Sequence, residues 1–348
     1  AGGITTCAKS TGTLPRMIFP DGSEYPVFRP VGTNVIEQVR IVAIALANGA
    51  KALVLECMAL QPQLQWLSEA KLIRATIGVI TNVRADHLDV MGPTERDVAL
   101  AMAATTPVKG KLFLGDPRHA EVFRYAAEDR GTELIQVSTK EIGAVTEEEM
   151  ARFSYIEHRQ NVALALRVCR ELGVDRQTAL EGMWRGIPDP GVTTIYPIRF
   201  FGRQLFFVNG FSANDPESTQ SIWNRALDNF PKAEKRILII NCRADRPYRT
   251  KQFAEACGMW RPADYYMLIG SGTYVFTRGA ATAGIPVQKL IFAENRSEQQ
   301  IFEKILEVSG RYALLVGVAN IKEPGMSLLH YFRNRSIRPE GVQWNTYP

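Results

Sequence analysis

The sequence has 348 residues, of which 46% are hydrophobic and 22% are charged. This composition is ordinary for globular proteins and excludes collagen-like, coiled-coil and wholly disordered chains. At about 150 residues per domain, the length predicts two domains, each with a core of its own. No apolar run approaches the roughly 18 residues that a spanning helix needs, so we do not expect this chain itself to cross a membrane.

The net charge is +5, from 41 basic and 36 acidic residues. The basic residues are scattered and form no block interleaved with aromatic residues, so nucleic acid is not an expected partner. The five cysteines lie far apart in the sequence and include no CxxC pair. This spacing argues against a disulfide framework and against a zinc site, and reduced thiols in the cytosol are the expectation.

Short apolar runs in the first half predict strands that are buried on both faces. Strands are expected at 5–8, 52–55, 77–80, 111–114 and 134–137. Helical patterns lie among them, at 37–48 and 94–105. Strands that alternate with helices of about 10–15 residues predict βαβ units and a mostly parallel sheet.

Two prolines and two glycines between Gly186 and Gly191 follow a helical stretch at 161–185 and interrupt regular structure. We therefore place the first domain at 1–189 and a second α/β domain at 190–335. Further strands are expected at 204–209, 236–241, 266–269 and 313–316, and helices at 218–229, 251–259 and 298–308. A polar tail at 336–348 is expected on the surface or disordered.

Two polar segments follow predicted strands of the first half, where ligands of open parallel sheets gather. Glu56 comes directly after the strand at 52–55, and an acid in this place can hold Mg²⁺; a solvated strand-end acid is the alternative. Asn82, Asp86 and His87 follow the strand at 77–80. The neighbouring carboxylates could orient the His87 ring near a metal, whereas an isolated strand-end histidine would be structural.

A near-match to the phosphate-binding pattern GxxxxGK[ST] ends at Lys9 and Ser10, with Ala8 in place of the second glycine. That motif needs a helix directly after it, because the phosphate binds at the helix N-terminus. Gly12 and Pro15 follow instead and disfavour a long helix. We therefore predict a strand that leads into a loop here, and no phosphate-binding loop.

The second half has polar loops after two of its predicted strands. The first loop contains Asn209 and Asn214, and the second contains Arg243, Asp245 and Arg246. Arginine side chains suit phosphate or carboxylate groups, with a surface ion-pair cluster as the alternative. The sequence lacks a GxSxG nucleophile elbow and a complete GxGxxG loop, which disfavours a serine hydrolase and a simple Rossmann dehydrogenase.

Taken together, these segments resemble the ligase subunit of poly-γ-glutamate synthases, within the Mur-ligase-like ATP-dependent amide ligases. The similarity runs from about Cys7 to about Phe332. It implies a Mur-ligase-like central domain without its phosphate-loop strand and a Rossmann-like C-terminal α/β domain. It also implies ATP and Mg²⁺ as cofactors. In the implied reaction, ATP phosphorylates a carboxylate of glutamate or of the growing chain, and the next glutamate amine attacks the acyl phosphate to form a γ-amide.

The resemblance also implies roles for the residues singled out above. Glu56 and His87 would hold Mg²⁺. The implied catalytic residues are Asp86, His87 and Arg243. The implied nucleotide-binding residues are Asn82, Asn209, Asn214, Asp245 and Arg246. The implied substrate-binding residues are Lys9, Thr11 and Thr13.

The sequence departs from the family pattern in three places. The family's phosphate loop, Gly-x-Arg-Gly-Lys-Ser/Thr, is expected upstream of Lys9 together with a membrane segment, and neither occurs in this sequence. A lysine that often follows the Asp-His motif in Mur ligases is missing from 98–103, and Thr193 and Thr194 stand near the place of an expected arginine. We therefore expect an incomplete first domain and impaired activity of this chain alone.

Two alternatives stay open: a non-catalytic Mur-like scaffold subunit of a membrane polymer-synthesis complex, and a related ligase for another acceptor, such as a folate or a peptide. The missing phosphate loop favours the scaffold, whereas a metal pair together with an arginine cluster favours an enzyme. The resemblance implies a location at the cytoplasmic face of the bacterial membrane. Its implied partners are glutamate, the poly-γ-glutamate chain and other membrane subunits of the synthase, and a homo-oligomer is also considered.

Overall fold

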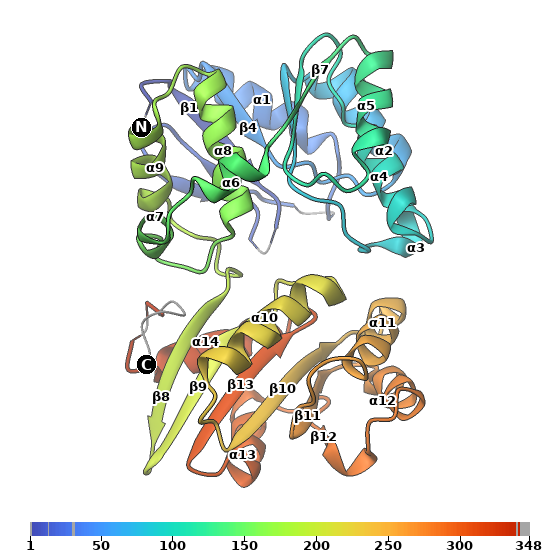
Figure 1. Ribbon diagram of the computed structural model, residues 1–348, viewed down its shortest axis with the longest axis vertical. Helices are drawn as coiled ribbons and strands as arrows, with labels where there is room; N and C mark the ends of the chain where they lie inside the picture. Colours follow the sequence, from blue (N-terminus) through green and yellow to red (C-terminus); the bar gives the residue numbers. More distant parts are fainter. Residues whose placement is uncertain (1, 13, 30–31, 339, 342–348) are drawn as a thin grey trace. The chain divides into compact units, whose positions relative to one another are not determined.

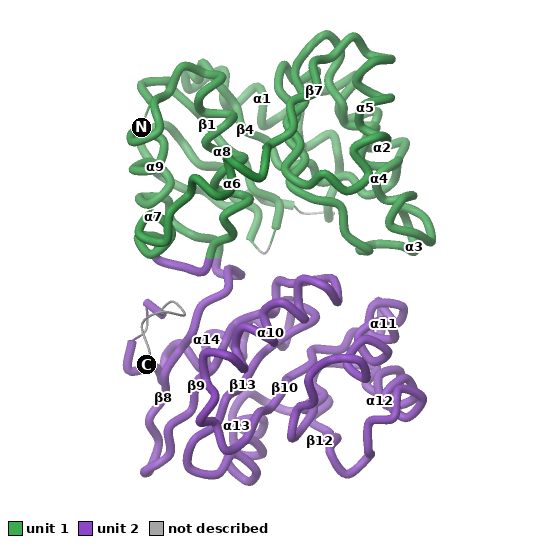
Figure 2. Tube along the Cα trace, in the orientation of Figure 1, with its two compact units in different colours: residues 1–153, 157–189 green, residues 154–156, 190–348 purple. Residues whose placement is uncertain are grey.

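The computed structural model describes residues 2–12, 14–29, 32–338 and 340–341. The chain divides into two compact units (Figure 2): unit 1 comprises residues 1–153 and 157–189, and unit 2 comprises residues 154–156 and 190–348. The short segment 154–156 belongs to unit 2 because Ile156 packs against its core and donates a backbone hydrogen bond to Thr193 O at 3.1 Å. Unit 2 is therefore built from two separate stretches of sequence.

The first sheet of unit 1 combines a parallel pair with an antiparallel meander, in the order β3-β2-β1-β4. Its strands are β1 (Thr6–Ser10), β2 (Arg16–Ile18), β3 (Glu24–Pro26) and β4 (Ala52–Leu55). Helix α1 (Glu37–Ala47) covers one face of this sheet through Ile41 and Ala45, which pack against Cys7 and Met17. Strands β2 and β3 have only three residues each, which is too short for a hydrophobic period to reveal them.

The second sheet of unit 1 is parallel throughout, in the order β5-β6-β7. Its strands are β5 (Ile77–Ile80), β6 (Lys111–Leu114) and β7 (Glu133–Gln136). Ile80, Leu112 and Leu114 pack in a common core with Val98 of helix α4 (Glu95–Ala103) and Phe123 of helix α5 (Ala120–Asp129). The apolar run of β6 is therefore buried as predicted, whereas β5 and β7 are buried only in part.

The remaining helices of unit 1 are α2 (Pro62–Leu67), the π-helix η1 (Ser68–Ile73), α3 (Leu88–Met91), α6 (Thr139–Gly143), α7 (Glu147–Ala151), α8 (Arg159–Glu171) and α9 (Arg176–Arg185). The helical stretch expected at 161–185 is thus two helices. Gly173 adopts a φ of 75°, which ends α8 in the manner that glycine favours. The Asp175 side chain then caps α9 by accepting a hydrogen bond from Thr178 N at 3.0 Å.

Strands β4 and β5 each stand at the end of a sheet and are strongly apolar. Val54 of β4 is 62% exposed and Val79 of β5 is 45% exposed. On α1, the residues turned away from the sheet are also apolar, among them Val39, Val42 and Leu46, all of which are exposed. Sheet edges in proteins are usually protected by charges or prolines, and a helix that is apolar on all sides is usually buried.

Unit 2 contains one six-stranded sheet in the order β12-β11-β10-β13-β9-β8, in which only β8 runs antiparallel to its neighbour (Figure 1). Its strands are β8 (Thr194–Phe200), β9 (Arg203–Asn209), β10 (Lys235–Cys242), β11 (Tyr265–Gly270), β12 (Leu290–Phe292) and β13 (Tyr312–Val318). Its helices are α10 (Pro216–Asn229), α11 (Pro247–Cys257), α12 (Thr273–Thr282), the 3₁₀ helix η2 (Val287–Lys289), α13 (Glu298–Val308) and α14 (Gly325–Arg335).

The sheet of unit 2 is buried on both faces by large side chains. Phe206 and Val208 face the core that includes Trp223 of α10, whereas Leu205 and Phe207 face the core that includes Phe332 of α14. The alternation along β9 therefore places consecutive residues in different cores. Beyond α14, the described part of the expected tail lies along β8, where Ser336 pairs with Ile198.

These two units confirm the predicted fold class, mostly parallel sheets flanked by helices in two α/β units. Within the described residues, no helix is both long enough and apolar enough to cross a bilayer. All five cysteines are free thiols.

Candidate active site

The helices that follow β4 and β5, α2 and α3, are in contact with each other. Gln65 donates a hydrogen bond from Nε2 to Sδ of Met91 at 3.5 Å. A cleft of about 460 Å³ lies beside this contact and is lined by the segment 33–35, by Met58 and Leu60 and by Val90 of α3; Glu56, Asp86 and His87 are not among its lining residues. Strand ends of neighbouring βα units commonly form ligand sites in this way.

Glu56 is held at the end of β4 by its neighbours in the first sheet. Its Oε2 accepts a hydrogen bond from Thr11 N, its backbone N donates to Lys9 O at 3.1 Å, and its backbone O accepts from Gln38 Nε2 at 3.2 Å. The carboxylate is nevertheless exposed to solvent. Glu56 therefore has a fixed backbone and a side chain that an oxygen-seeking cation such as Mg²⁺ can reach.

Lys9 and Thr11 belong to a buried ion-pair network in the same region. Lys9 is only 2% exposed, and its Nζ lies 2.9 Å from Oε1 of Glu37. Arg29 donates to both oxygens of Glu37, at 2.6 and 2.9 Å, and to Oγ1 of Thr11 at 3.2 Å. The ammonium group of Lys9 is therefore already paired inside the protein. Thr13 lies outside the described residues.

The network also changes the titration of Glu37. Burial alone would raise the pKa of its carboxyl group, but hydrogen bonds and charges from Arg29 and Lys9 outweigh this effect and lower the pKa to about 2. Lys9 and Ser10 themselves lie within β1, and β2 follows them in place of a helix. The near-match to a phosphate-binding loop therefore has no helix N-terminus behind it.

Asp86 and His87 lie in the loop between β5 and α3. His87 immediately precedes α3 and has a φ of 52°, a left-handed conformation that residues other than glycine seldom adopt. Its backbone N donates to Oδ1 of Asp86 at 2.8 Å, and its ring Nε2 lies 3.6 Å from Oδ2 of the same residue. Asn82 lies earlier in the same loop.

The described residues contain no group of three or more His, Cys, Asp or Glu side chains that could hold a metal ion. This finding does not test the pair of Glu56 and His87, because Mg²⁺ at nucleotide sites takes one or two protein ligands and completes its shell with phosphate oxygens and water. The carboxylate of Glu56 has the donor chemistry that Mg²⁺ prefers, and it is accessible.

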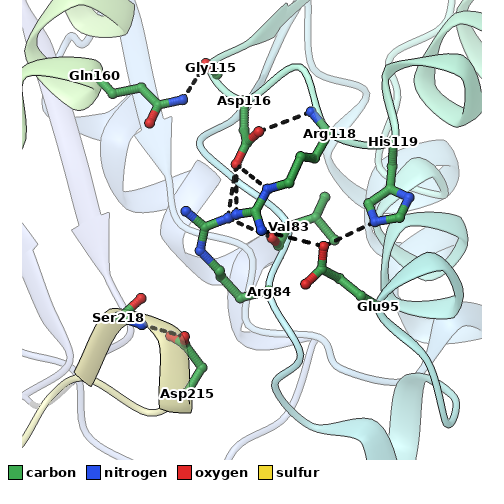
Figure 3. Close-up of polar contacts among 10 residues, drawn as sticks. All are labelled: Val83, Arg84, Glu95, Gly115, Asp116, Arg118, His119, Gln160, Asp215 and Ser218. Carbon is green, nitrogen blue, oxygen red and sulfur yellow. Dashed lines mark hydrogen bonds and ion pairs between the residues drawn. The ribbon is translucent and has the colours of Figure 1, made fainter. Parts of the chain in front are cut away.

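A second network, absent from the sequence predictions, lies at the carboxyl end of β6 (Figure 3). Oδ2 of Asp116 lies 2.9 Å from Nη1 of Arg84 and accepts hydrogen bonds from Arg118 at 3.0 and 3.1 Å. Oε1 of Glu95 lies 3.0 Å from the His119 ring and 3.7 Å from Arg118. The signal in the sequence that could have found this network is Asp116, an acid close behind the apolar run at 111–114. A signal of the same kind singled out Glu56.

In unit 2, the candidate residues also follow strand ends. Asn209 is fully buried at the end of β9, and its Nδ2 donates to Val192 O at 3.0 Å and to Pro190 O at 3.4 Å, while its Oδ1 has no partner within the described residues. Asn214 accepts a hydrogen bond at 2.9 Å from Arg249, a residue without a role in the sequence predictions. Asn209 therefore holds the backbone that leads into β8.

Arg243 and Asp245 follow β10 and form an ion pair in which one edge of the guanidinium group meets both carboxylate oxygens. Nε of Arg243 donates to Oδ1 of Asp245 at 2.8 Å, and Nη2 donates to Oδ2. This pairing lowers the pKa of the Asp245 carboxyl group. Arg246 immediately precedes α11. The ion pair that the sequence offered as the alternative is therefore present. Its presence does not test whether Arg243 also binds substrate.

Solved structures place this fold among the Mur-type and folylpolyglutamate-synthase-like proteins. E. coli FolC in complex with DHPP and ADP matches with a TM-score of 0.68 and 14% identity, over 96% of this chain and 82% of that chain. A bifunctional folylpolyglutamate synthase/dihydrofolate synthase with Mn, AMPPNP and L-glutamate bound matches with a TM-score of 0.61 and 11% identity, over 94% and 82%. MurF from Acinetobacter baumannii matches with a TM-score of 0.56 and 14% identity, over 86% and 70%. These similarities show the fold.

Sequence comparisons identify the family. The profile of the poly-gamma-glutamate synthase CapB C-terminal domain matches residues 195–335. PGA synthase CapB of Bacillus subtilis (strain 168) is 38% identical over 340 residues, which cover 96% of this chain and 86% of that protein. Capsule biosynthesis protein CapB of Bacillus anthracis is 39% identical over 334 residues, covering 95% and 71%. The chain belongs to the poly-γ-glutamate synthase CapB family, which confirms the predicted family and ligase class.

Proposed function

We propose that this protein forms γ-glutamyl amide bonds at the expense of ATP. A carboxylate oxygen of glutamate or of the polymer attacks the γ-phosphorus of ATP, and ADP leaves. The amine of an incoming glutamate then attacks the acyl carbon, so that phosphate and a proton are released. Membership in the family supports this proposal, as do a folylpolyglutamate synthase of the same fold with L-glutamate bound and a FolC with ADP bound.

The observation that carries the proposal is the position of Glu56 directly after β4 and of Asp86 and His87 in the loop after β5, with the helices that follow the two strands, α2 and α3, in contact through Gln65 and Met91. Glu56 and His87 would hold Mg²⁺, which neutralises phosphoryl oxygens when it is bound. Asp86 accepts a hydrogen bond from the backbone N of His87 and so fixes the conformation of His87. Asn82, in the same loop, can donate a hydrogen bond to a phosphate oxygen.

We further propose that a parallel strand fits between β4 and β5 and joins the two sheets of unit 1. Both strands are apolar, both stand at the end of a sheet, and their valines are exposed. A strand in that position would end beside Glu56 and the loop at 81–87. A phosphate-binding loop after such a strand would then face the proposed metal ligands, because parallel strands share one carboxyl edge.

In unit 2, Arg243 and Arg246 are proposed to neutralise phosphate or carboxylate charge, with Asn214, Asp245 and Asn209 supporting the nucleotide region. The exposure of Asp245, whose side chain is 62% exposed against 19% for Arg243, supports this role, since a substrate anion can compete with Asp245 for the guanidinium group. Lys9 and Thr11 are proposed to act on substrate only through Glu56, which Thr11 contacts directly.

The scaffold alternative is supported by one observation, the unpaired apolar edges of β4 and β5, which could equally receive a strand from a partner subunit. The two readings differ in what they require of Glu56. An enzyme needs the carboxylate, whereas a scaffold does not. Three further predictions from the sequence stay predictions: other membrane subunits as partners, a homo-oligomer, and a location at the cytoplasmic face of the membrane.

The test is to incubate the protein, joined to the strand and phosphate-binding loop proposed above, with ATP, Mg²⁺ and glutamate and to measure ADP release together with the γ-glutamyl product. We expect both products from the natural protein and neither above background from Glu56→Gln. The matched control is Glu171→Gln, which removes a surface ion pair with Lys111 and should retain full activity. Equal activity of all three proteins would refute the proposed site, and binding of a partner subunit without ADP release by any of them would favour the scaffold.

A further inference from the structure

Asp116 is only 5% exposed and lies just after β6, beside the loop that carries Asn82, Asp86 and His87 (Figure 3). We infer that Asp116 is a positioning residue, which fixes this loop through Arg84 in the geometry that phosphoryl transfer needs. The inference rests on the proposed function. Asp116 is assigned no contact with substrate and acts only through the loop.

The first step of the argument is the pairing of Asp116 with Arg84. A buried carboxylate is costly unless charged or hydrogen-bonding groups surround it. Nη1 of Arg84 meets that need at 2.9 Å and also donates to Val83 O at 3.1 Å. Arg84 lies between Asn82 and Asp86 in the sequence. The guanidinium group thus ties the middle of the candidate loop to a fixed point on the neighbouring strand.

The second step is that Asp116 is itself rigidly placed. Gly115 N donates to Ile80 O at 2.9 Å, and Gln160 donates to Gly115 O at 2.6 Å. A Cβ atom added to Gly115 would lie 2.6 Å from Thr81 O, so the ends of β5 and β6 are in close backbone contact directly before Asn82. The residue directly before Asp116 is therefore fixed to the end of β5 and to Gln160 of α8, which limits how far the anchor of Arg84 can move.

The third step is the left-handed backbone of His87. A residue other than glycine keeps a positive φ only when its surroundings determine it. Asp86 accepts a hydrogen bond from His87 N, and the Arg84 side chain, three residues before His87, is held by Asp116. Loss of the second contact would let the segment relax and would change where the His87 ring points.

A further network fixes the other side of Asp116. Arg118 donates to both carboxylate oxygens of Asp116, from its backbone N to Oδ1 and from its side chain to Oδ2. The Arg118 side chain also lies 3.7 Å from Glu95, in the first turn of α4. Oε1 of Glu95 lies 3.0 Å from the His119 ring. Asp116 therefore stands between two guanidinium groups. Removal of its charge would leave Arg84 and Arg118 close together with no buried anion between them, and their repulsion would release Arg84 from its anchor.

The experiment compares Asp116→Asn, Arg84→Lys and Glu56→Gln in the full-length protein. Two quantities are measured: the affinity for Mn²⁺ in the presence of a non-hydrolysable ATP analogue, by electron paramagnetic resonance of free Mn²⁺, and hydrogen–deuterium exchange of the peptide spanning 81–91. Residues that orient a metal ligand typically change affinity by roughly 10-fold to 100-fold. We expect Asp116→Asn and Arg84→Lys to weaken Mn²⁺ binding by this amount and to speed exchange in 81–91.

The control is Glu171→Gln, which removes a partner of Lys111 at the opposite end of the same strand, β6. Exchange in 81–91 that is no faster in Asp116→Asn than in this control would overturn the inference. If Asp116→Asn does not fold, the same comparison with Arg84→Lys decides. Glu56→Gln should weaken Mn²⁺ binding and leave exchange in 81–91 unchanged. Mn²⁺ binding that is unaffected by Glu56→Gln would contradict the proposed metal site, while the exchange data would still decide the role of Asp116.

Discussion

The backbone N of Thr11 donates a hydrogen bond to the Glu56 side chain, so the loop after β1 holds the carboxylate that ends β4. Thr11 in turn accepts a hydrogen bond from Arg29, which is paired with Glu37. The proposed metal ligand is therefore connected to a buried ion-pair network. Substitutions in that network should affect stability and metal binding in different proportions.

Glu56→Gln should lower kcat by roughly 100-fold, comparable to the loss of one preorganised electrostatic contact in an active site. Glutamine keeps an oxygen that can accept from Thr11 N, so the free energy of unfolding should change by less than about 0.5 kcal/mol. Steady-state kinetics over a range of Mg²⁺ concentrations, together with urea denaturation, would check both parts. A fall in stability equal to that of a core substitution would contradict the assignment.

Glu37→Gln should destabilise the protein by about 3 kcal/mol, because it leaves the buried ammonium group of Lys9 without its counter-charge. The double variant with Lys9→Met should recover part of the loss, since a buried pair can often be replaced by apolar groups. Urea denaturation at neutral pH measures both. No recovery in the double variant would show that Arg29 is the principal partner.

Stability should also depend on pH through Glu37. Its pKa is lowered to about 2 in the folded protein, below the usual value of 4.5. The unfolded chain therefore binds this proton more readily, and the stabilisation is complete above the usual pKa and is lost as the pH falls from about 5 towards 2. Denaturation midpoints measured across this range should decline less steeply in Glu37→Gln than in the natural protein.

Gly115→Ala should destabilise unit 1 by about 1–3 kcal/mol, because the added methyl group would meet Thr81 O and the backbone must move to accommodate it. Gly143→Ala is the matched control: no atom lies within 4 Å of its added Cβ, and it ends helix α6. Its effect on the free energy of unfolding should be close to zero or slightly stabilising. Equal effects of the two substitutions would mean that the ends of β5 and β6 are not in close contact.

Arg243→Lys should leave stability within about 0.5 kcal/mol of the natural protein, since lysine keeps the positive charge beside the exposed carboxylate of Asp245. Lysine cannot form the two-pronged contact that arginine makes with phosphate or carboxylate. If Arg243 binds substrate, kcat/KM should fall by at least about 10-fold. Unchanged kcat/KM would restrict Arg243 to its ion pair with Asp245.

The apolar runs at 52–55, 77–80 and 111–114 predicted β4, β5 and β6 with the bounds that the structure has. They succeeded because each strand is a continuous hydrophobic run, although only β6 is buried on both faces. Strand β8 was not predicted: it contains Pro197, which disfavours a strand inside a sheet, and it forms instead at the antiparallel edge of the sheet of unit 2.

Site residues that end a strand could be selected from the sequence, as Glu56 was. Asp116 was missed because Gly115 separates it from the apolar run and because its partners are residues distant in sequence or, like Arg118, without a motif. The pairing of Lys9 with Glu37 could not be predicted either, since nothing in a local pattern links a strand to a helix that begins 28 residues later. Such pairings arise from tertiary packing alone.

The segment 154–156 has a consequence for how the protein can be dissected. A fragment that begins at Pro190 would lack Ile156, and with it one side chain of the unit 2 core and the donor to Thr193 O. Transplanting unit 2 into another chain, or expressing it alone, would therefore require those three residues to be supplied as well. The unit that folds and the unit that a single cut in the gene would isolate are not the same.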